Sequence, residues 1–230
     1  MHNPIPTHVL VHGFRNRMYG VLALIGLIMA CSSSRVHAKD ETPGQLVLSN
    51  TERVIHALSD RRAEFQSNPA ALHQFIHAEF TQLFDRTYSA RLVLGLDSRA
   101  ASDVEMRAFV DALGDDLLNR YGNSLLKVHP GLNVRVVSET PLRNGTIIKV
   151  ACLIDRRAGP PVEVDYLLHQ NAGRWQAFDV IVEGISFVQT FRAMFVDELR
   201  SKSLAQITEE LRDDRIQVKT AIPHRPSGKQ

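Results

Sequence analysis

The hydrophobic period of the chain changes near residue 132, and this change limits the folds that the chain can adopt. Before that point, apolar residues recur at three- and four-residue spacing, as on amphipathic helices. From Leu132 to Val182 the period is two, which is typical of half-buried strands. Turn-forming residues interrupt this part at 144–145, 159–161 and 171–173. Because each interruption is short, the strands should form an antiparallel meander.

The parity of the apolar residues predicts four strands, at about 132–138, 146–155, 162–169 and 174–182, each with one apolar face. An antiparallel sheet of this kind buries its apolar face under helices. The fold class is therefore α+β, an antiparallel four-stranded meander with one face covered by helices. The residues expected on the covered face are Val134, Val136, Ile148, Val150, Cys152, Ile154, Val162, Val164, Tyr166, Leu168, Phe178, Val180 and Val182.

Capping signals place the helices on either side of the sheet. Ser-x-x-Glu and Ser-x-x-Gln boxes satisfy backbone donors at a helix start, and a glycine can end a helix in the left-handed conformation. The expected helices are Pro43 to about Gln66, one opening at Asn68-Pro69, a short one ending at Gly95, one from Ser102-x-x-Glu105 to Gly122, and two opening at Ser186-x-x-Gln189 and Ser203-x-x-Gln206.

The N-terminus has the pattern of an export signal. Arginines precede the apolar run Val21–Ala30, and Val36-His37-Ala38 fits a small-residue cleavage site. We therefore divide the chain into a signal peptide at 1–38, a folded domain at 39–213, and a polar tail at 214–230 that we expect to be disordered. Acylation of Cys31 as a lipoprotein is an alternative, and a start at Met18 is a minor one.

Composition excludes some classes of function. The apolar fraction of 44% and the charged fraction of 23% are ordinary for a soluble protein. A net charge of +2 without long basic runs argues against nucleic acid as a partner. Cleavage after Ala38 would leave Cys152 as the only cysteine, where it is expected to be a small buried hydrophobe.

Two short motifs resemble catalytic or metal sites but lack an essential part. His73 and His77 lie on one helix face, yet Gln74 stands where a zinc protease needs a glutamate, and no third ligand has a motif-like spacing. Gly184-Ile185-Ser186 resembles a nucleophile elbow, but Val188 replaces its second glycine. We therefore expect no catalytic residue, no metal and no cofactor.

Longer motifs resemble one protein family. The blocks W-Q-A-F-D-V-I-V-E-G-I-S (175–186) and T-F-R-A-M-F (190–195) resemble the signature of the MlaC-type phospholipid-binding proteins, also called the toluene-tolerance family. The resemblance extends upstream through ARLVLG at Ala90–Gly95 and the helix with Phe109, Leu117 and Tyr121, and it covers roughly residues 45–212. After Gly95 the family often has an aromatic and a basic residue, whereas this chain has Leu96-Asp97-Ser98-Arg99.

The resemblance implies a periplasmic carrier that shuttles phospholipid between the outer and inner membranes and maintains outer-membrane lipid asymmetry. It implies an apolar lipid cavity, phospholipid as cargo, and two partners: an inner-membrane ABC transporter with an MCE-domain subunit and an outer-membrane lipoprotein–porin complex. Pattern alone favours an ordinary core over a cavity. An isomerase- or hydratase-like enzyme is the alternative, which a titratable group such as Asp165, Asp179 or His169 deep in the pocket would support. The predicted cavity residues are Phe75, Phe80, Leu92, Phe109, Leu113, Val134, Val136, Ile148, Val150, Val164, Tyr166, Phe178, Val180, Val188, Phe191 and Phe195.

Overall fold

The computed structural model describes residues 41–126, 132–156 and 159–216 of the 230-residue chain. The predicted signal peptide and Cys31 lie outside the described residues, and so does the predicted tail beyond Ile216. Ile216 itself is buried against the helices, so packed structure extends three residues past the expected domain end at 213. Among the described residues, no helix is both long and apolar enough to cross a membrane.

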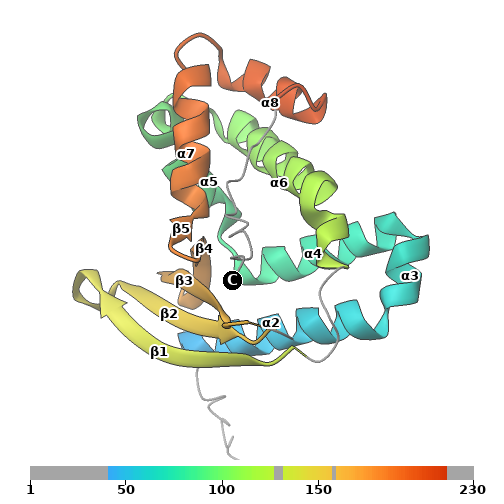
Figure 1. The fold of residues 1–230 in the computed structure, drawn as a ribbon. Helices are drawn as coiled ribbons and strands as arrows, with labels where there is room; N and C mark the ends of the chain where they lie inside the picture. Colours follow the sequence, from blue (N-terminus) through green and yellow to red (C-terminus); the bar gives the residue numbers. More distant parts are fainter. Residues whose placement is uncertain (1–40, 127–131, 157–158, 217–230) are drawn as a thin grey trace, which may run out of the picture. The chain divides into compact units, whose positions relative to one another are not determined.

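The helices begin where the capping signals predicted them (Figure 1), but the helix that begins at Asp103 continues to Leu125, past its predicted end at Gly122. Asn68 and Ser186 accept hydrogen bonds from the first turns of their helices, and the boxes at Ser102 and Ser203 are formed. The expected first helix is instead two helices, because Arg61 interrupts the helical conformation. The bounds are α2 Pro43–Asp60, α3 Arg62–Ser67, α4 Pro69–Leu83, α5 Arg86–Leu94, the 3-10 helix η1 Gly95–Arg99, α6 Asp103–Leu125, α7 Phe187–Glu198 and α8 Leu204–Arg212.

The sheet is an antiparallel meander in the order β1-β2-β3-β4-β5, which confirms the predicted α+β class. Four of its strands correspond to the expected ones, although the first continues four residues past its expected end at 138, and a two-residue fifth strand follows them. At the first hairpin Leu142 pairs with Ile147, so the connection is a four-residue loop rather than a tight turn on Asn144-Gly145 alone. The bounds are β1 Val134–Leu142, β2 Ile147–Ile154, β3 Val162–Asn171, β4 Arg174–Val182 and β5 Ile185–Ser186.

A bulge in β4 changes which aromatic residue faces the covered side of the sheet. Leu167 pairs with Asp179 and Leu168 with Ala177, so Phe178 is the extra residue. An extra residue reverses the alternation of side chains beyond it. Ala177 therefore joins the sheet core, and the placement of Phe178 on that face by simple parity was wrong.

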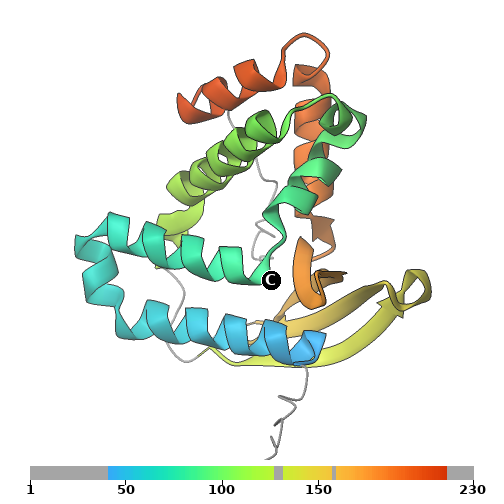
Figure 2. The same cartoon turned by 180° about the vertical axis from the view of Figure 1, so that it is seen from behind.

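The described residues form three apolar clusters rather than one core. The sheet face packs with α2 and the end of α4. Helices α5, α6, α7 and α8 form a cluster that contains no strand residue. A third cluster joins the facing ends of α2, α3 and α4, and the last turn of α6 packs against it. Figure 2 shows the ribbon from the opposite side, with α2 along the sheet. The helices therefore divide into those that cover the sheet and those that pack mainly on each other.

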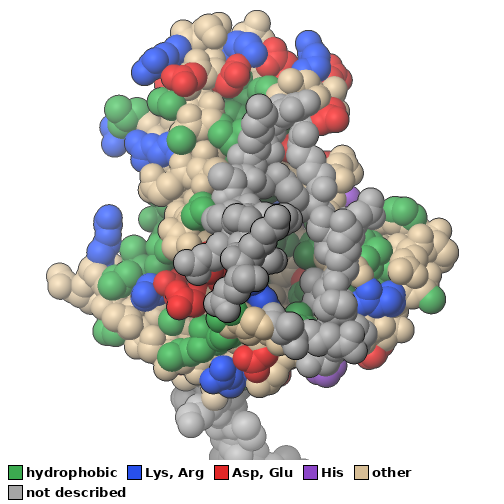
Figure 3. All heavy atoms as spheres, in the orientation of Figure 1, with side chains coloured by type: hydrophobic (Ala, Val, Ile, Leu, Met, Phe, Trp, Pro, Cys, Tyr) green, Lys and Arg blue, Asp and Glu red, His purple; other side chains and the backbone are tan. Residues whose placement is uncertain are grey.

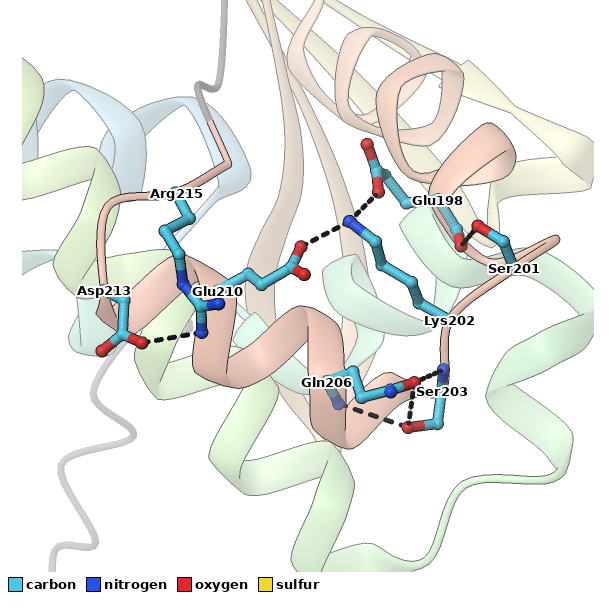
Figure 4. Close-up of polar contacts among 8 residues, drawn as sticks. All are labelled: Glu198, Ser201, Lys202, Ser203, Gln206, Glu210, Asp213 and Arg215. Atoms are coloured by element: carbon cyan, nitrogen blue, oxygen red, sulfur yellow. Dashed lines mark hydrogen bonds and ion pairs between the residues drawn. The ribbon is translucent and has the colours of Figure 1, made fainter.

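An ion-pair network fixes the corner between α7 and α8 (Figure 4). The Lys202 amine lies 2.7 Å from a Glu198 oxygen and 2.6 Å from a Glu210 oxygen. Hydrogen bonds to these two carboxylates raise the pKa of Lys202. Lys202 therefore stays charged at neutral pH and links the end of α7 to α8 across the turn.

Candidate lipid-binding face

The covered face of the sheet is apolar but incompletely buried. At its centre Val150 and Leu168 are fully enclosed. Helix α2 lies over β1 and β2, whereas α4, α5 and α7 meet the sheet chiefly at β4. Apolar side chains that keep accessible surface in a folded protein can receive an apolar ligand without displacing their neighbours. The partly buried residues of this face are Val136, Ile148, Ile154, Val162, Tyr166, Val180 and Val182.

Helix α2 supplies the opposite wall of this face. Val47 is fully buried against the strands, with Leu46, Leu48 and Ile55 partly buried beside it. The sequence predicted this helix, but none of these four residues is among the predicted cavity residues. Val47 is seven residues before Val54 and so lies on the same helical stripe. Polar residues at 50 and 51 interrupt that stripe, which is why the apolar pattern did not extend to Val47.

Tyr166 places a polar group within the apolar surface. Its hydroxyl lies 3.5 Å from the Thr51 hydroxyl of α2, and either group can donate. Burial raises the pKa of Tyr166, and the contact with Thr51 opposes that shift only in part. The phenol therefore stays neutral and acts as a hydrogen-bonding group, not as a base.

A buried carboxylate joins α2 to α4 beside this surface. Glu79 accepts hydrogen bonds from the Asn50 amide at 3.0 Å and from Arg53 Nε at 2.8 Å. Glu79 and Asn50 are buried, while the Arg53 side chain is about half exposed. A charged group is tolerated inside a protein when it is paired and hydrogen-bonded, as Glu79 is here. The contact fixes the two helices relative to each other.

Phe80 and Phe84 mark an open edge of the apolar face. Their rings stack with centroids 4.1 Å apart. Phe84 is buried on the sheet core and bridges to Ala177, and the next residue, Asp85, donates its backbone N–H to the carbonyl of Ala177 at 2.8 Å. Phe80, in contrast, is 42% exposed. A phenyl ring that keeps this much surface while stacked at the margin of an apolar face is positioned to contact a ligand.

The structure does not bring the sixteen predicted cavity residues together. The sheet residues share one face with the exception of Phe178, which contacts the rings of Tyr88 and His169. Phe75 belongs to the α2–α4 cluster and stacks on Phe65. A third group lies in or against the separate helical core, where Phe109 and Phe195 meet edge to face and retain no accessible surface. This third group is Leu92, Phe109, Leu113, Val188, Phe191 and Phe195.

The titratable residues that an enzyme would need have structural partners. Asp179 is buried and accepts hydrogen bonds from the Ser186 hydroxyl at 2.5 Å and the Val188 backbone N–H at 3.0 Å, so it caps α7. Asp165 pairs with Lys149 on the sheet, and His169 lies 3.2 Å from Asp85. Asp179 and His169 therefore connect different elements of the fold, and Asp165 connects two neighbouring strands.

The two histidines of the helical motif also make separate contacts. His73 lies 3.4 Å from Asp115, and His77 Nε2 lies 3.1 Å from Arg86. A guanidinium can only donate, so His77 Nε2 is the acceptor of this hydrogen bond. In the part of the chain that the structure describes, no group of three His, Cys, Asp or Glu residues could hold a metal ion.

Comparisons with known proteins give a consistent result. The family model of the MlaC protein matches residues 49–213. The toluene tolerance protein ttg2D of Pseudomonas putida is 24% identical over 163 residues, which cover 70% of this chain and 74% of that protein. A phospholipid-binding protein from Ralstonia solanacearum, solved in complex with a phospholipid, has a similar fold with a TM-score of 0.67. It is 17% identical, and the match covers 76% of this chain and 96% of that one.

The family match spans most of the described structure. It includes α2 from residue 49 onward, the whole sheet and α7 and α8 up to residue 213. The resemblance inferred from the blocks around Trp175 and Phe191 is thereby confirmed. The chain belongs to the MlaC protein family.

Proposed function

We propose that this protein is a periplasmic carrier that binds phospholipid on the apolar face of its sheet and shuttles it between the outer and inner membranes. The observation that carries the proposal is the partly exposed apolar face, formed by Val136, Ile148, Tyr166 and Val180 and bordered by Phe80. The solved Ralstonia relative supports it, because its similar fold holds a phospholipid.

The energetics suit a carrier. Two acyl tails with some thirty methylenes would gain roughly 20 kcal/mol on leaving water, at about 0.8 kcal/mol per methylene. A bilayer offers a similar gain, so transfer between the protein and a membrane is near balance. No covalent chemistry is then needed, and docking to a membrane complex can decide the direction. We propose the same partners as the resemblance implied, an inner-membrane ABC transporter with an MCE-domain subunit and an outer-membrane lipoprotein–porin complex.

The proposed lipid-binding site contains fewer residues than the sixteen cavity residues predicted from the sequence. Residues that keep accessible surface on the sheet face make first contact with the tails. Fully enclosed residues such as Phe109 and Phe195 support the helices instead. Whether the deeper residues also contact lipid stays a prediction.

Native mass spectrometry of protein purified from the periplasm tests the proposal. We expect a copurified phospholipid. Ile148→Asp and Val180→Asp should remove it, because a charge on the apolar face must be desolvated when the tails bind. Val137→Asp is the matched control, since Val137 lies on the same sheet but is 59% exposed. Full lipid occupancy in folded Ile148→Asp and Val180→Asp variants would place the site elsewhere.

The position of the mature N-terminus tests whether the protein diffuses between the two membranes. A carrier that visits two membranes must diffuse, so we propose cleavage after Ala38 and a mature chain that begins at Lys39. Intact-mass measurement distinguishes this chain from one that begins at a diacylated Cys31. The second result would restrict the protein to one membrane, because a 12-residue tether reaches at most about 40 Å.

A further inference from the structure

Exposed aliphatic side chains occur on three elements that flank α5: η1, the start of α6 and α7. Among the described residues, six large hydrophobic side chains are exposed, and three of them lie here. Leu96 is 74% exposed in the 3-10 helix η1, Val104 is 67% exposed in the first turn of α6, and Val196 is 46% exposed on α7. Single exposed aliphatic residues are common on protein surfaces, so their neighbours decide whether they matter.

Three arginines accompany these side chains. Arg99 follows Leu96 in η1, Arg107 is one turn after Val104, and Arg192 is one turn before Val196 on the same face of α7. The Arg192 guanidinium lies next to Gly95, because a Cβ built there would be 3.3 Å from one of its nitrogens. We call this set of residues the η1 patch: Leu96, Val104, Val196, Arg99, Arg107 and Arg192.

The η1 patch keeps a positive charge that its acidic neighbours do not cancel. Within the described residues, the three arginines of the patch form no ion pair. Asp103 and Asp197 are instead paired with Arg91 and Arg200, outside the patch. Asp97 and Glu105, which accepts hydrogen bonds from Ser102, are the remaining carboxylates of η1 and the first turn of α6, so the three arginines still outnumber them. Unpaired arginines around exposed aliphatic side chains attract an anionic surface that also has an apolar layer.

The position of the patch favours a bilayer over a protein partner. The turn between α5 and α6 lies at the outer edge of the ribbon in both views (Figures 1 and 2). At the upper left of the space-filling view, hydrophobic and Lys/Arg side chains lie next to each other (Figure 3). Protein interfaces concentrate aromatic anchors in pockets. The η1 patch instead offers aliphatic side chains on an outer turn, which can enter the boundary between lipid headgroups and acyl chains.

We propose that the η1 patch docks this protein directly on a membrane that contains anionic phospholipid. The arginines contact the headgroup phosphates, and Leu96 and Val104 enter the interface below them. This inference goes beyond the proposed function, because it concerns a surface that does not overlap the apolar face of the sheet. Docking would bring the carrier to the membrane before any exchange of cargo.

Vesicle flotation tests the docking surface. The full mature chain is mixed with phosphatidylcholine vesicles with or without 30% phosphatidylglycerol, at low and high salt. We expect binding only to vesicles with phosphatidylglycerol, and weaker binding at high salt because surface charges are screened. A basic residue at an anionic surface contributes about fivefold in affinity, so Arg99→Gln/Arg107→Gln should bind about 25-fold more weakly. Leu96→Asn should lose about fivefold through its apolar contact.

Matched controls separate the patch from general charge and hydrophobicity. Arg135→Gln removes an exposed arginine on β1, and Val137→Asn removes an exposed aliphatic residue of the same strand. Both should bind vesicles as the parent does. Copurified lipid, measured by native mass spectrometry, should be unchanged in all of these variants. Absence of copurified lipid in a parent protein that still binds vesicles would count against the carrier function and leave the η1 patch intact.

Three results would overturn the inference. The parent protein could fail to bind vesicles with phosphatidylglycerol, or the patch variants, shown to be folded by circular dichroism, could bind as tightly as the parent. Sedimentation could also show a dimer that Leu96→Asn dissociates, which would assign the patch to a second copy of the chain.

Discussion

Replacing Phe195 by alanine tests whether the helical core is separate from the lipid surface. Phe195 has no accessible surface and packs edge to face on Phe109, with centroids 5.4 Å apart. Truncation of a buried phenylalanine costs about 3–5 kcal/mol through lost burial and the cavity left behind. Within this sum, the edge-to-face contact contributes about 1 kcal/mol. We therefore expect Phe195→Ala to lower the free energy of unfolding by about 4 kcal/mol.

Urea denaturation of the lipid-free and the lipid-loaded protein measures this loss. A ligand that binds only the folded state adds to the free energy of unfolding. If Phe195 does not touch the tails, the variant should lose the same free energy in both forms. Val196→Ala is the control, because that neighbour is 46% exposed and its truncation should cost less than about 0.5 kcal/mol.

Two outcomes would refute this reasoning. A loss below about 1.5 kcal/mol in the lipid-free protein would mean that the helical core is not packed as the structure has it. A loss at least about 1 kcal/mol larger in the lipid-loaded form would mean that Phe195 contacts the cargo, as the sequence predicted. The second result would widen the proposed site to the helical layer.

Three further predictions concern single residues. Burial, with a smaller contribution from the charge of Asp165, raises the pKa of Cys152 to about 11, so this thiol should resist iodoacetamide at pH 8 in the folded protein and react after unfolding. Asp179→Ala should cost about 2 kcal/mol in urea denaturation, because it leaves buried donors of α7 without an acceptor, whereas exposed Asp197→Ala should cost less than about 0.5 kcal/mol. Gly95→Ala should lower the free energy of unfolding by about 1–3 kcal/mol, because its φ of +61° and ψ of −127° strain any residue with a Cβ, and an unchanged value would contradict that conformation.

The sequence predicted the elements because their signals are local. A capping box such as Ser203 and Gln206 acts within one turn, and the alternation in β2 and β3 follows directly from the pleat. The break at Arg61 has no such signal, since no glycine or proline marks it. The bulge at Phe178 was missed for another reason. The apolar residues of β4 change there from odd positions (Trp175, Ala177) to even positions (Phe178, Val180, Val182), and only the pairing with β3 shows that Phe178 is the extra residue.

The composition of the candidate site was predictable only in part. The sheet face could be identified because residues of equal parity on paired strands must share a side. The sequence did not show which helical residues pack on the sheet and which pack on other helices. An apolar stripe shows that a residue faces inward, but not which neighbour it meets. Phe109 and Val150 have equal burial in the structure, yet they belong to different clusters.

The separation of the cores has a mechanical consequence for a carrier. Exchange of a lipid requires the apolar face to open and close without unfolding the protein. If α5–α8 keep their own core, the sheet and α2 can move against them while most buried contacts within each layer persist. Two links between the sheet and the helices α5–α8 then act as hinges. One is the Phe84–Asp85 connection at the edge of β4, and the other is Asp179 at the start of α7. A single continuous core would resist such motion, because close-packed interiors do not deform gradually.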